Sequence, residues 1–325
     1  LYFNKMNKIN FFINFEPKNI AYGGGNVFSL NLINYLKNKN INITYDLNNN
    51  IDIFFIIDPH KGPFKKYGLD EIVNYRNKIK KGKIIIRVND CDKTRPNVTK
   101  ERSREYKIMQ NYNNIDLYIF NSDFIREYYM NKYDKLKDIN YQIIYNGGNN
   151  QILKPRQLYK KPKCLKIVTH HWSDNINKGY ETYYKLHKFF ENRTDYEFIF
   201  VGRKFNDNYK GVPVKGPYKG QELANVLKSC DIYVTDSKWD SCPMHVVEAI
   251  LCGLPILYTS CEGGGKNLCE LPNEKIGESF SSFPELIDKI EIISENYDLY
   301  RNNILKNIDI YKNENCMSKY FKSII

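Results

Sequence analysis

The sequence has few of the features that mark membrane-spanning or disordered proteins. No apolar run approaches the roughly 18 residues that a membrane-spanning helix needs, and the longest, residues 249–258, is interrupted by Gly253 and Pro255. Of the 325 residues, 42% are hydrophobic and 26% charged, which excludes a disordered chain. No charged start followed by an apolar stretch is found, so we expect no secretory leader. We expect a cytoplasmic protein, with a peripheral position at a membrane surface as the alternative.

The eight cysteines lack the spacings of a metal site. No two form a Cys-x-x-Cys pair, and no Cys/His cluster has zinc-ligand spacing. In a chain of this length, reduced thiols in a reducing compartment are the simplest interpretation.

Acidic residues are fewer than basic ones. The chain has 37 Asp and Glu against 49 Lys and Arg, which gives a net charge of +12. Such an excess favours anionic partners: nucleotide phosphates, nucleic acid or an acidic membrane surface. The densest basic stretches are residues 76–83 and 156–166. No long basic arm interleaved with aromatic residues occurs, so we do not expect nucleic-acid binding.

Apolar strand-like runs alternate with helical patterns almost from end to end. This alternation predicts an α/β protein with doubly wound parallel sheets, and the length suggests two domains. We expect an N-terminal domain over residues 1–153, a basic, Pro-containing linker over 154–163 and a C-terminal domain over 164–300. A cleft between the two domains would be the natural ligand site. The predicted strands are residues 9–15, 51–57, 83–88, 117–121, 141–145, 165–169, 197–201, 231–235 and 255–258.

The tail of the chain from residue 283 has no strand pattern. Leu286, Ile290, Ile293 and Tyr297 lie at helical spacing. We expect the final helix, residues 301–325, to pack back on the N-terminal domain. Basic amphipathic attachment to a membrane is the alternative.

The most informative segment is residues 231–265, which predicts a strand, a loop and a helix that begins near Pro243. Backbone N–H groups at that helix start would form an anion site. Asp240 and Ser241 are good capping types, and Glu248 follows eight residues after Asp240. An anionic ligand with hydroxyl groups could bind here. A capping Asp and a solvated Glu are the alternative.

This segment resembles the retaining glycosyltransferases of family 4, which have the GT-B fold: two Rossmann-like domains facing across a cleft, with C-terminal helices crossing back. The resemblance implies that Glu248 binds the nucleotide ribose and that Asp240 faces the donor sugar and phosphate. It also places Cys242, Pro243 and Met244 at the donor. Most members have Glu where this chain has Asp240. The matching residues, in the order of the family signature, are Asp240, Glu248, Ala249, Cys252, Gly253 and Pro255.

A second match is the Lys178-Gly179 pair after the first strand of the second domain. The resemblance implies that Lys178 neutralises the departing nucleoside diphosphate. Family members often have Arg five residues earlier, where this chain has Ser173; Arg203 is our substitute candidate, and His170 and His171 are weaker ones. Lys178 as a surface lysine and Arg203 as a solvated loop end are the alternatives.

In the first domain, Gly24 and Gly25 end a glycine triplet before a helix. Glycines allow a backbone to approach phosphate closely. Phe28 replaces the third glycine of the dinucleotide fingerprint, so that motif is absent. Family 4 chains carry a similar loop beside the donor diphosphate and the acceptor, whereas a simple turn is the alternative.

Polar residues at the ends of first-domain strands are candidates for acceptor binding. Arg87, Asn89 and Asp90 lie at the end of one buried strand, and His60 follows another. Members often have a His-Asp pair at the first place, and Asn89 cannot serve as a base. For His60, a core or loop histidine is the alternative.

Asp90-Cys91-Asp92 also matches the metal-diphosphate motif of GT-A glycosyltransferases. A GT-A fold would have one sheet, and it would leave Asp240 and Glu248 without a role. We therefore expect no metal.

The resemblance implies a metal-independent enzyme without a cofactor, which moves a sugar from a UDP or GDP donor to a hydroxyl of a glycan, lipid or protein, with retention of configuration. Two alternatives stay open. One is a nucleotide-sugar isomerase or hydrolase, and the other is a non-catalytic protein that binds a nucleotide sugar or glycan.

Overall fold

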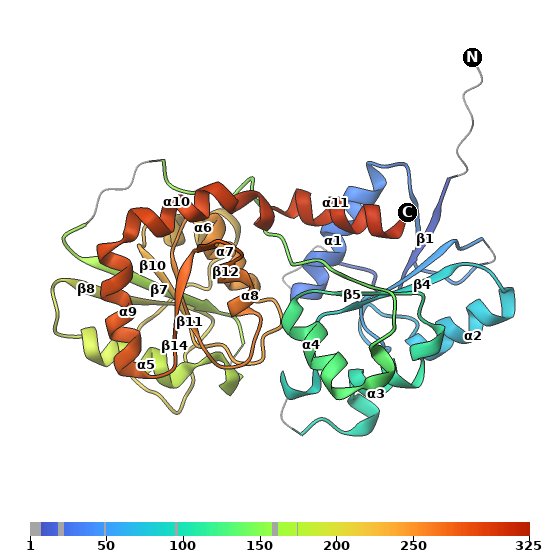
Figure 1. Cartoon of the computed structure of the whole chain (residues 1–325), viewed down its shortest axis with the longest axis horizontal. Helices are drawn as coiled ribbons and strands as arrows, with labels where there is room; N and C mark the ends of the chain where they lie inside the picture. Colours follow the sequence, from blue (N-terminus) through green and yellow to red (C-terminus); the bar gives the residue numbers. More distant parts are fainter. Residues whose placement is uncertain (1–7, 19–22, 49, 95–96, 158–161, 174) are drawn as a thin grey trace, which may run out of the picture. The chain divides into compact units, whose positions relative to one another are not determined.

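The computed structural model describes residues 8–18, 23–48, 50–94, 97–157, 162–173 and 175–325 (Figure 1). The chain divides into two compact units, Leu1–Tyr145 with Cys316–Ile325, and Asn146–Asn315. These limits differ from the predicted domain boundaries, because residues 146–153 and 301–315 group with the second unit. Within that unit, Gly148 and Lys312 form a β-bridge that joins the two stretches.

The first unit is built on a six-stranded sheet of order β2-β1-β3-β4-β5-β6, in which all neighbours pair in parallel. Its strands are β1 (Asn10–Ile13), β2 (Asn42–Thr44), β3 (Ile53–Ile56), β4 (Lys83–Val88), β5 (Leu117–Phe120) and β6 (Tyr141–Ile143). Its helices are α1 (Gly23–Lys37), α2 (Leu69–Ile79), α3 (Arg104–Gln110), α4 (Asp123–Lys132) and most of α11 (Asn313–Ile324), with the short 3-10 turns η1 (Asp92–Thr94), η2 (Lys100–Arg102), η3 (Tyr112–Asn114) and η4 (Asp134–Leu136).

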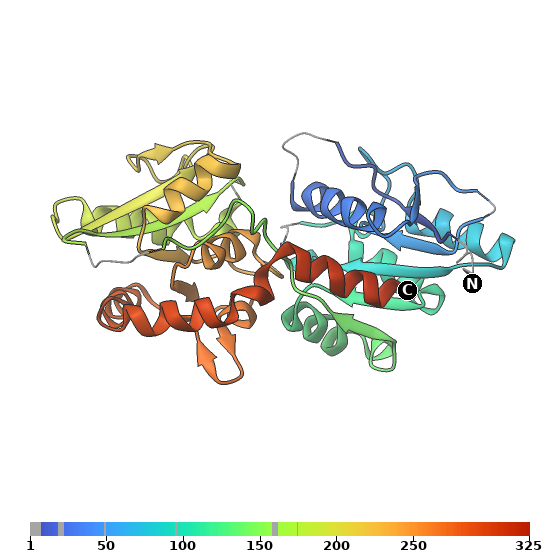
Figure 2. The same cartoon turned by 90° about the horizontal axis from the view of Figure 1, so that it is seen from above.

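Helices cover both faces of this sheet. Successive strand residues point to opposite sides, so neighbouring residues pack against different helices. Phe11 and Phe55 pack with α1 and α11, whereas Phe12 and Phe54 pack with α2, α3 and α4. From α11, Tyr320 is fully buried in the first of these clusters. Figure 2 shows this helix, in red, running along the first unit. The last helix is thus part of the N-terminal core.

The second unit has a six-stranded parallel sheet of order β14-β11-β10-β7-β8-β9. Counted along the chain this is the 3-2-1-4-5-6 order of nucleotide-binding folds, and it reverses between β7 and β10. The strands are β7 (Leu165–His171), β8 (Tyr196–Gly202), β9 (Val214–Lys215), β10 (Ile232–Thr235), β11 (Ile256–Thr259) and β14 (Gly277–Phe280), beside a hairpin of β12 (Glu270–Leu271) and β13 (Glu274–Lys275). The helices are η5 (Ile176–Lys178), α5 (Tyr180–Phe190), α6 (Gly220–Lys228), α7 (Met244–Leu251), α8 (Gly265–Cys269), α9 (Phe283–Glu295), α10 (Tyr297–Asn307) and η6 (Ile308–Tyr311).

The predicted class, two doubly wound parallel sheets, is confirmed. A single-sheet GT-A fold does not fit, since the structure has a six-stranded parallel sheet in each unit. Strands β2, β9 and β14 were not predicted, because they are two to four residues long and lack an apolar run. Within the described residues, no helix is long and apolar enough to cross a membrane.

Candidate active site

The candidate residues of the second unit gather at the carboxyl ends of β7 and β10. These are the two strands at which the strand order reverses. In open α/β sheets, ligands bind in the crevice outside the carboxyl ends at such a point. Lys178 follows β7, and Asp240 follows β10. The topology therefore brings together two residues that lie 62 positions apart in the chain.

A glycine fixes the approach of the two loops. Gly179 ends η5 with φ +81°, and a Cβ there would lie 2.5 Å from the Cβ of Asp236 and 2.7 Å from its carbonyl oxygen. Only glycine fits both this left-handed conformation and this close contact. The backbone N–H of Lys238 donates to the carbonyl of Asn177 at 2.8 Å. The loop after β7 is thereby bound to the loop after β10.

Lys178 and Asp240 form an ion pair, with Nζ 2.6 Å from Oδ2. Each side chain is 22% exposed, so the pair is still accessible to solvent. His245 lies behind it, with Nε2 3.7 Å from the same carboxylate oxygen. Although burial would raise the pKa of Asp240, the charge of Lys178 and the contact with His245 hold it well below its ordinary value. Burial lowers the pKa of His245 to about 4, so this imidazole is neutral at physiological pH.

Glu248 pairs with His170, whose Nε2 lies 2.8 Å from Oε2. The two residues come from different elements, since His170 lies in β7 and Glu248 in α7. His170 is buried, whereas the Glu248 side chain is 26% exposed. The solvated helix face that was the alternative for Glu248 does not describe this carboxylate, which has a buried partner.

The alternation of side chains along β7 explains why the two neighbouring histidines have different surroundings. His170 contacts Glu248 of α7, whereas Nε2 of His171 lies 2.8 Å from the hydroxyl of Tyr183 in α5, and the centre of the His171 ring lies 4.6 Å from that of His245. Burial lowers the pKa of His171 well below its ordinary value. Its contacts are those of a core residue.

The start of α7 was predicted to have a cap from Asp240 or Ser241. In the structure the N-cap residue is Pro243, which makes no side-chain cap hydrogen bond, and Asp240 binds Lys178 instead. The first turn of α7 has no acidic residue, so its side chains do not neutralise the positive end of the helix dipole. This end of α7 remains suited to an anion. Met244 is its first residue.

Cys242 belongs to the wall of the site. Its Sγ and its carbonyl accept hydrogen bonds from the backbone N–H (3.3 Å) and side-chain amide (2.9 Å) of Asn146. The loop is closed on the other side by Gly264, whose N–H donates to the carbonyl of Asp240 at 2.7 Å. The backbone around Asp240 is thus fixed from both sides.

Arg203 is exposed just beyond β8. Its guanidinium carbon lies 6.0 Å from the centre of the Trp172 ring. Trp172 is 42% exposed. Within the described residues, the ion pair of Lys178 and Asp240 does not include Arg203. Its role as a substitute cation stays a prediction.

The glycines of the first unit, Gly24 and Gly25, lie in the first turn of α1 and not in a loop before it. A Cβ at Gly24 would meet nothing within 4 Å, and one at Gly25 only Ile57 at 3.9 Å. Packing within the described residues therefore does not require glycine at either position.

The predicted acceptor residues take part in internal contacts. Arg87 is 4% exposed, donates to the Tyr320 hydroxyl (3.2 Å) and stacks on Phe28. Asp90 pairs with Arg104. Asn89 is half-buried. Acceptor binding by these residues stays a prediction.

The ion-pair network around Asp58 was not predicted from the sequence. This buried carboxylate binds Arg104 at 2.6 Å and Lys65 at 2.9 Å, and His60 Nδ1 lies at 3.5 Å. Burial would raise its pKa, but the hydrogen bond with His60 and the two cations hold it well below its ordinary value. Arg104 therefore shares its charge between Asp58 and Asp90.

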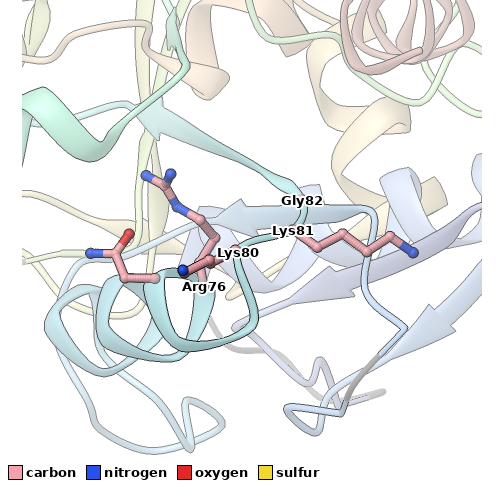
Figure 3. A pocket seen from close by; sticks show the side chains of 5 residues that line it. Arg76, Lys80, Lys81 and Gly82 are labelled. Atoms are coloured by element: carbon pink, nitrogen blue, oxygen red, sulfur yellow. The ribbon is translucent and has the colours of Figure 1, made fainter.

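A basic pocket of about 300 Å³ lies elsewhere on the first unit (Figure 3). The pocket lies where α2 ends and β4 begins, at the opposite end of β4 from Asn89. Lys81 pairs with Asp52 at 2.9 Å. The pocket is separate from the candidate residues. Its lining is Arg76, Asn77, Lys80, Lys81 and Gly82.

The described residues contain no group of three His, Cys, Asp or Glu side chains that could hold a metal. Of the Asp-x-Asp pair, Asp90 binds Arg104, and Asp92 accepts from the hydroxyl of Ser103. These partners occupy the carboxylates that a GT-A site would use for a metal.

Comparison with known proteins bears on the second unit directly. Residues 169–288 match the family described as Glycosyl transferases group 1. The matched stretch contains Lys178, Asp240 and Glu248. No curated protein sequence matches the chain significantly.

Solved structures match both units. Sucrose-phosphate synthase from Thermosynechococcus elongatus is 14% identical with a TM-score of 0.67, covering 97% of this chain and 98% of its own. HepE of Anabaena in complex with UDP is 12% identical with a TM-score of 0.67, covering 97% and 99%. A glycosyltransferase from Rickettsia africae is 14% identical with a TM-score of 0.65, covering 98% of each chain. The likeness shows that the chain has the GT-B fold.

His245 was not predicted as a site residue from the sequence. It lies three positions before Glu248, on the same face of a predicted helix, and this i, i+3 spacing was the available signal. The structure places it within 3.7 Å of Asp240.

Proposed function

We propose that the protein is a retaining, metal-independent glycosyltransferase that moves a sugar from a nucleoside-diphosphate donor to an acceptor hydroxyl. The observation that carries the proposal is the Lys178–Asp240 pair beside Glu248 and the start of α7. These groups lie where the strand order of a nucleotide-binding sheet reverses, inside the stretch that matches the group 1 glycosyl transferases. The resemblance to family 4 supports retention.

In this proposal each group binds one part of the donor. The exposed side of Glu248 accepts a hydrogen bond from a ribose hydroxyl, and the start of α7 binds the diphosphate together with Cys242, Pro243 and Met244. Asp240 accepts hydrogen bonds from hydroxyls of the sugar. HepE was solved with UDP, and so UDP is the first nucleotide to test, with GDP as the alternative.

Lys178 supplies the main catalytic charge. Negative charge grows on the diphosphate as the glycosidic bond breaks, and a cation beside it stabilises the transition state more than the ground state. Because Asp240 binds Lys178 in the structure, the lysine must exchange this partner, at least in part, for the leaving phosphate. Arg203 is the second cation of the proposal.

The acceptor is a glycan, a lipid or a protein with a free hydroxyl, near Asn89 and His60 in this proposal. Asn89 has no basic group. The leaving phosphate itself then takes the acceptor's proton, which is consistent with attack on the face that the leaving group vacates and hence with retention.

A panel of UDP- and GDP-sugars, read by thermal shift, tests the proposal. A ligand that binds only the folded state raises Tm. Each stabilising donor is then incubated alone and with acceptors, and the products are analysed, with the anomeric configuration determined by NMR. Transfer with retention supports the proposal. Isomerised or hydrolysed donor as the sole product, or binding without turnover, would support a different activity.

A further inference from the structure

The buried imidazole of His170 contacts Glu248, the carboxylate that binds the ribose in the proposed function. His170 is 1% exposed, and its Nε2 lies 2.8 Å from Oε2 of Glu248. A carboxylate can only accept hydrogen bonds, so Nε2 carries the proton of this bond. One oxygen of Glu248, Oε2, thus accepts a hydrogen bond from His170. The other oxygen, Oε1, accepts no hydrogen bond from the described residues.

The imidazole is fixed by its surroundings. The Tyr233 hydroxyl accepts from the backbone N–H of His170 at 3.1 Å, and lies 3.4 Å from its carbonyl. The tyrosine ring, itself fully buried in β10, meets the imidazole edge-on at 5.5 Å between ring centres. Backbone pairing of His170 with Val201 completes the frame.

We propose that His170 is a positioning residue: it fixes Glu248 so that Oε1 faces the ribose hydroxyls, and it thereby makes the site selective for ribonucleotides. This inference rests on the proposed function. A glutamate side chain has several rotatable bonds, and fixing it before the ligand arrives removes an entropic cost of binding. His170 acts through Glu248 and does not touch the ligand.

The test compares UDP with 2′,3′-dideoxy-UDP by isothermal titration calorimetry of the full chain. The analogue lacks the ribose hydroxyls that would donate hydrogen bonds to Glu248. Wild type should bind UDP more tightly than the analogue. His170→Phe keeps a ring but has no N–H, and should weaken UDP binding about tenfold while the analogue's affinity stays unchanged. His170→Gln places an amide N–H near the same point and should retain most of the preference for UDP.

Several outcomes overturn the inference while the proposed function stands. One is a His170→Phe protein that still prefers UDP as wild type does. Another is an equal loss for UDP and the analogue, which would indicate a general structural role. A third is additivity of His170→Phe with Glu248→Ala, because a residue that acts through Glu248 has no effect without it.

Failure of the proposed donor site gives a different result, since wild type would then bind neither UDP nor GDP. A readout that leaves position 170 unchanged is histidine ¹⁵N NMR of the wild-type chain. UDP should shift the Nε2–H signal that is lost in His170→Gln, and dideoxy-UDP should not. Equal shifts with both ligands would contradict the inference even if His170→Phe does not fold.

Discussion

Asp240 is one methylene shorter than the glutamate that most family 4 chains have, and its carboxylate pairs with Lys178. Lys178→Ala should lower kcat by about 100-fold or more, because one electrostatic contact to the developing charge is lost. The loss of turnover should exceed the loss of stability, although Tm should fall somewhat because Asp240 loses its cation. Steady-state kinetics with Tm measured alongside checks this. Lys178→Arg keeps the charge in another shape and should be partly active. A fully active Ala variant would leave Arg203 as the next candidate.

Glu248→Ala should weaken donor binding more than it slows turnover at saturation. Loss of a charge-assisted hydrogen bond to a ribose hydroxyl costs about 1.5 to 3 kcal/mol, or roughly ten- to a hundredfold in Kd. Titration of UDP against wild type and variant measures it. The same Kd in both proteins would show that this carboxylate does not contact the nucleotide.

His245 should make the stability of the second unit depend on pH. Its pKa is lowered from 6.5 to about 4, so between these values the unfolded chain binds a proton that the folded chain does not. The stabilisation is complete above pH 6.5 and declines as the pH falls toward 4, by up to about 3 kcal/mol. Denaturant unfolding at pH 7, 6 and 5 should show a flatter dependence for His245→Gln. The buried His171 keeps part of the slope in both proteins. Identical slopes would contradict the assignment.

At the scale of elements, the start of α8 shapes the loop that carries Asp240. A Cβ on Gly264 would lie 1.8 Å from the carbonyl oxygen of Ser241, so Gly264→Ala must displace that loop. We expect a loss of about 1 to 3 kcal/mol in the free energy of unfolding and weaker UDP binding.

The neighbouring glycine gives the matched control for this change. A Cβ on Gly265 would lie 3.7 Å from the Cβ of Tyr258, an ordinary contact, so Gly265→Ala should be neutral or slightly stabilising. Denaturant unfolding and UDP titration of both variants separate the loop contact from a general effect of alanine. Equal behaviour of the two variants would be evidence against a role for the loop position.

At the scale of the whole molecule, the sequence predicts the two sheets because their long apolar strands alternate with helical patterns over most of the chain. The short strand β14 escapes prediction since its residues, Gly-Glu-Ser-Phe, have no apolar run and pair only in the assembled sheet. The resemblance to family 4 predicted Lys178, Asp240 and Glu248 as site residues, but the partners of these side chains depend on tertiary contacts. The bond between His170 and Glu248 joins residues 78 positions apart, and local patterns contain no information about it.

In the proposed function, the second unit binds a nucleoside diphosphate with its own charges, Lys178 and the start of α7. The most direct measurement is a UDP titration of the full chain, by calorimetry, in excess chelator and again with added magnesium or manganese. We expect one binding site per chain with the same Kd in all three conditions, and at least tenfold weaker binding for Glu248→Ala. Binding that disappears in chelator and returns with the metal would contradict it.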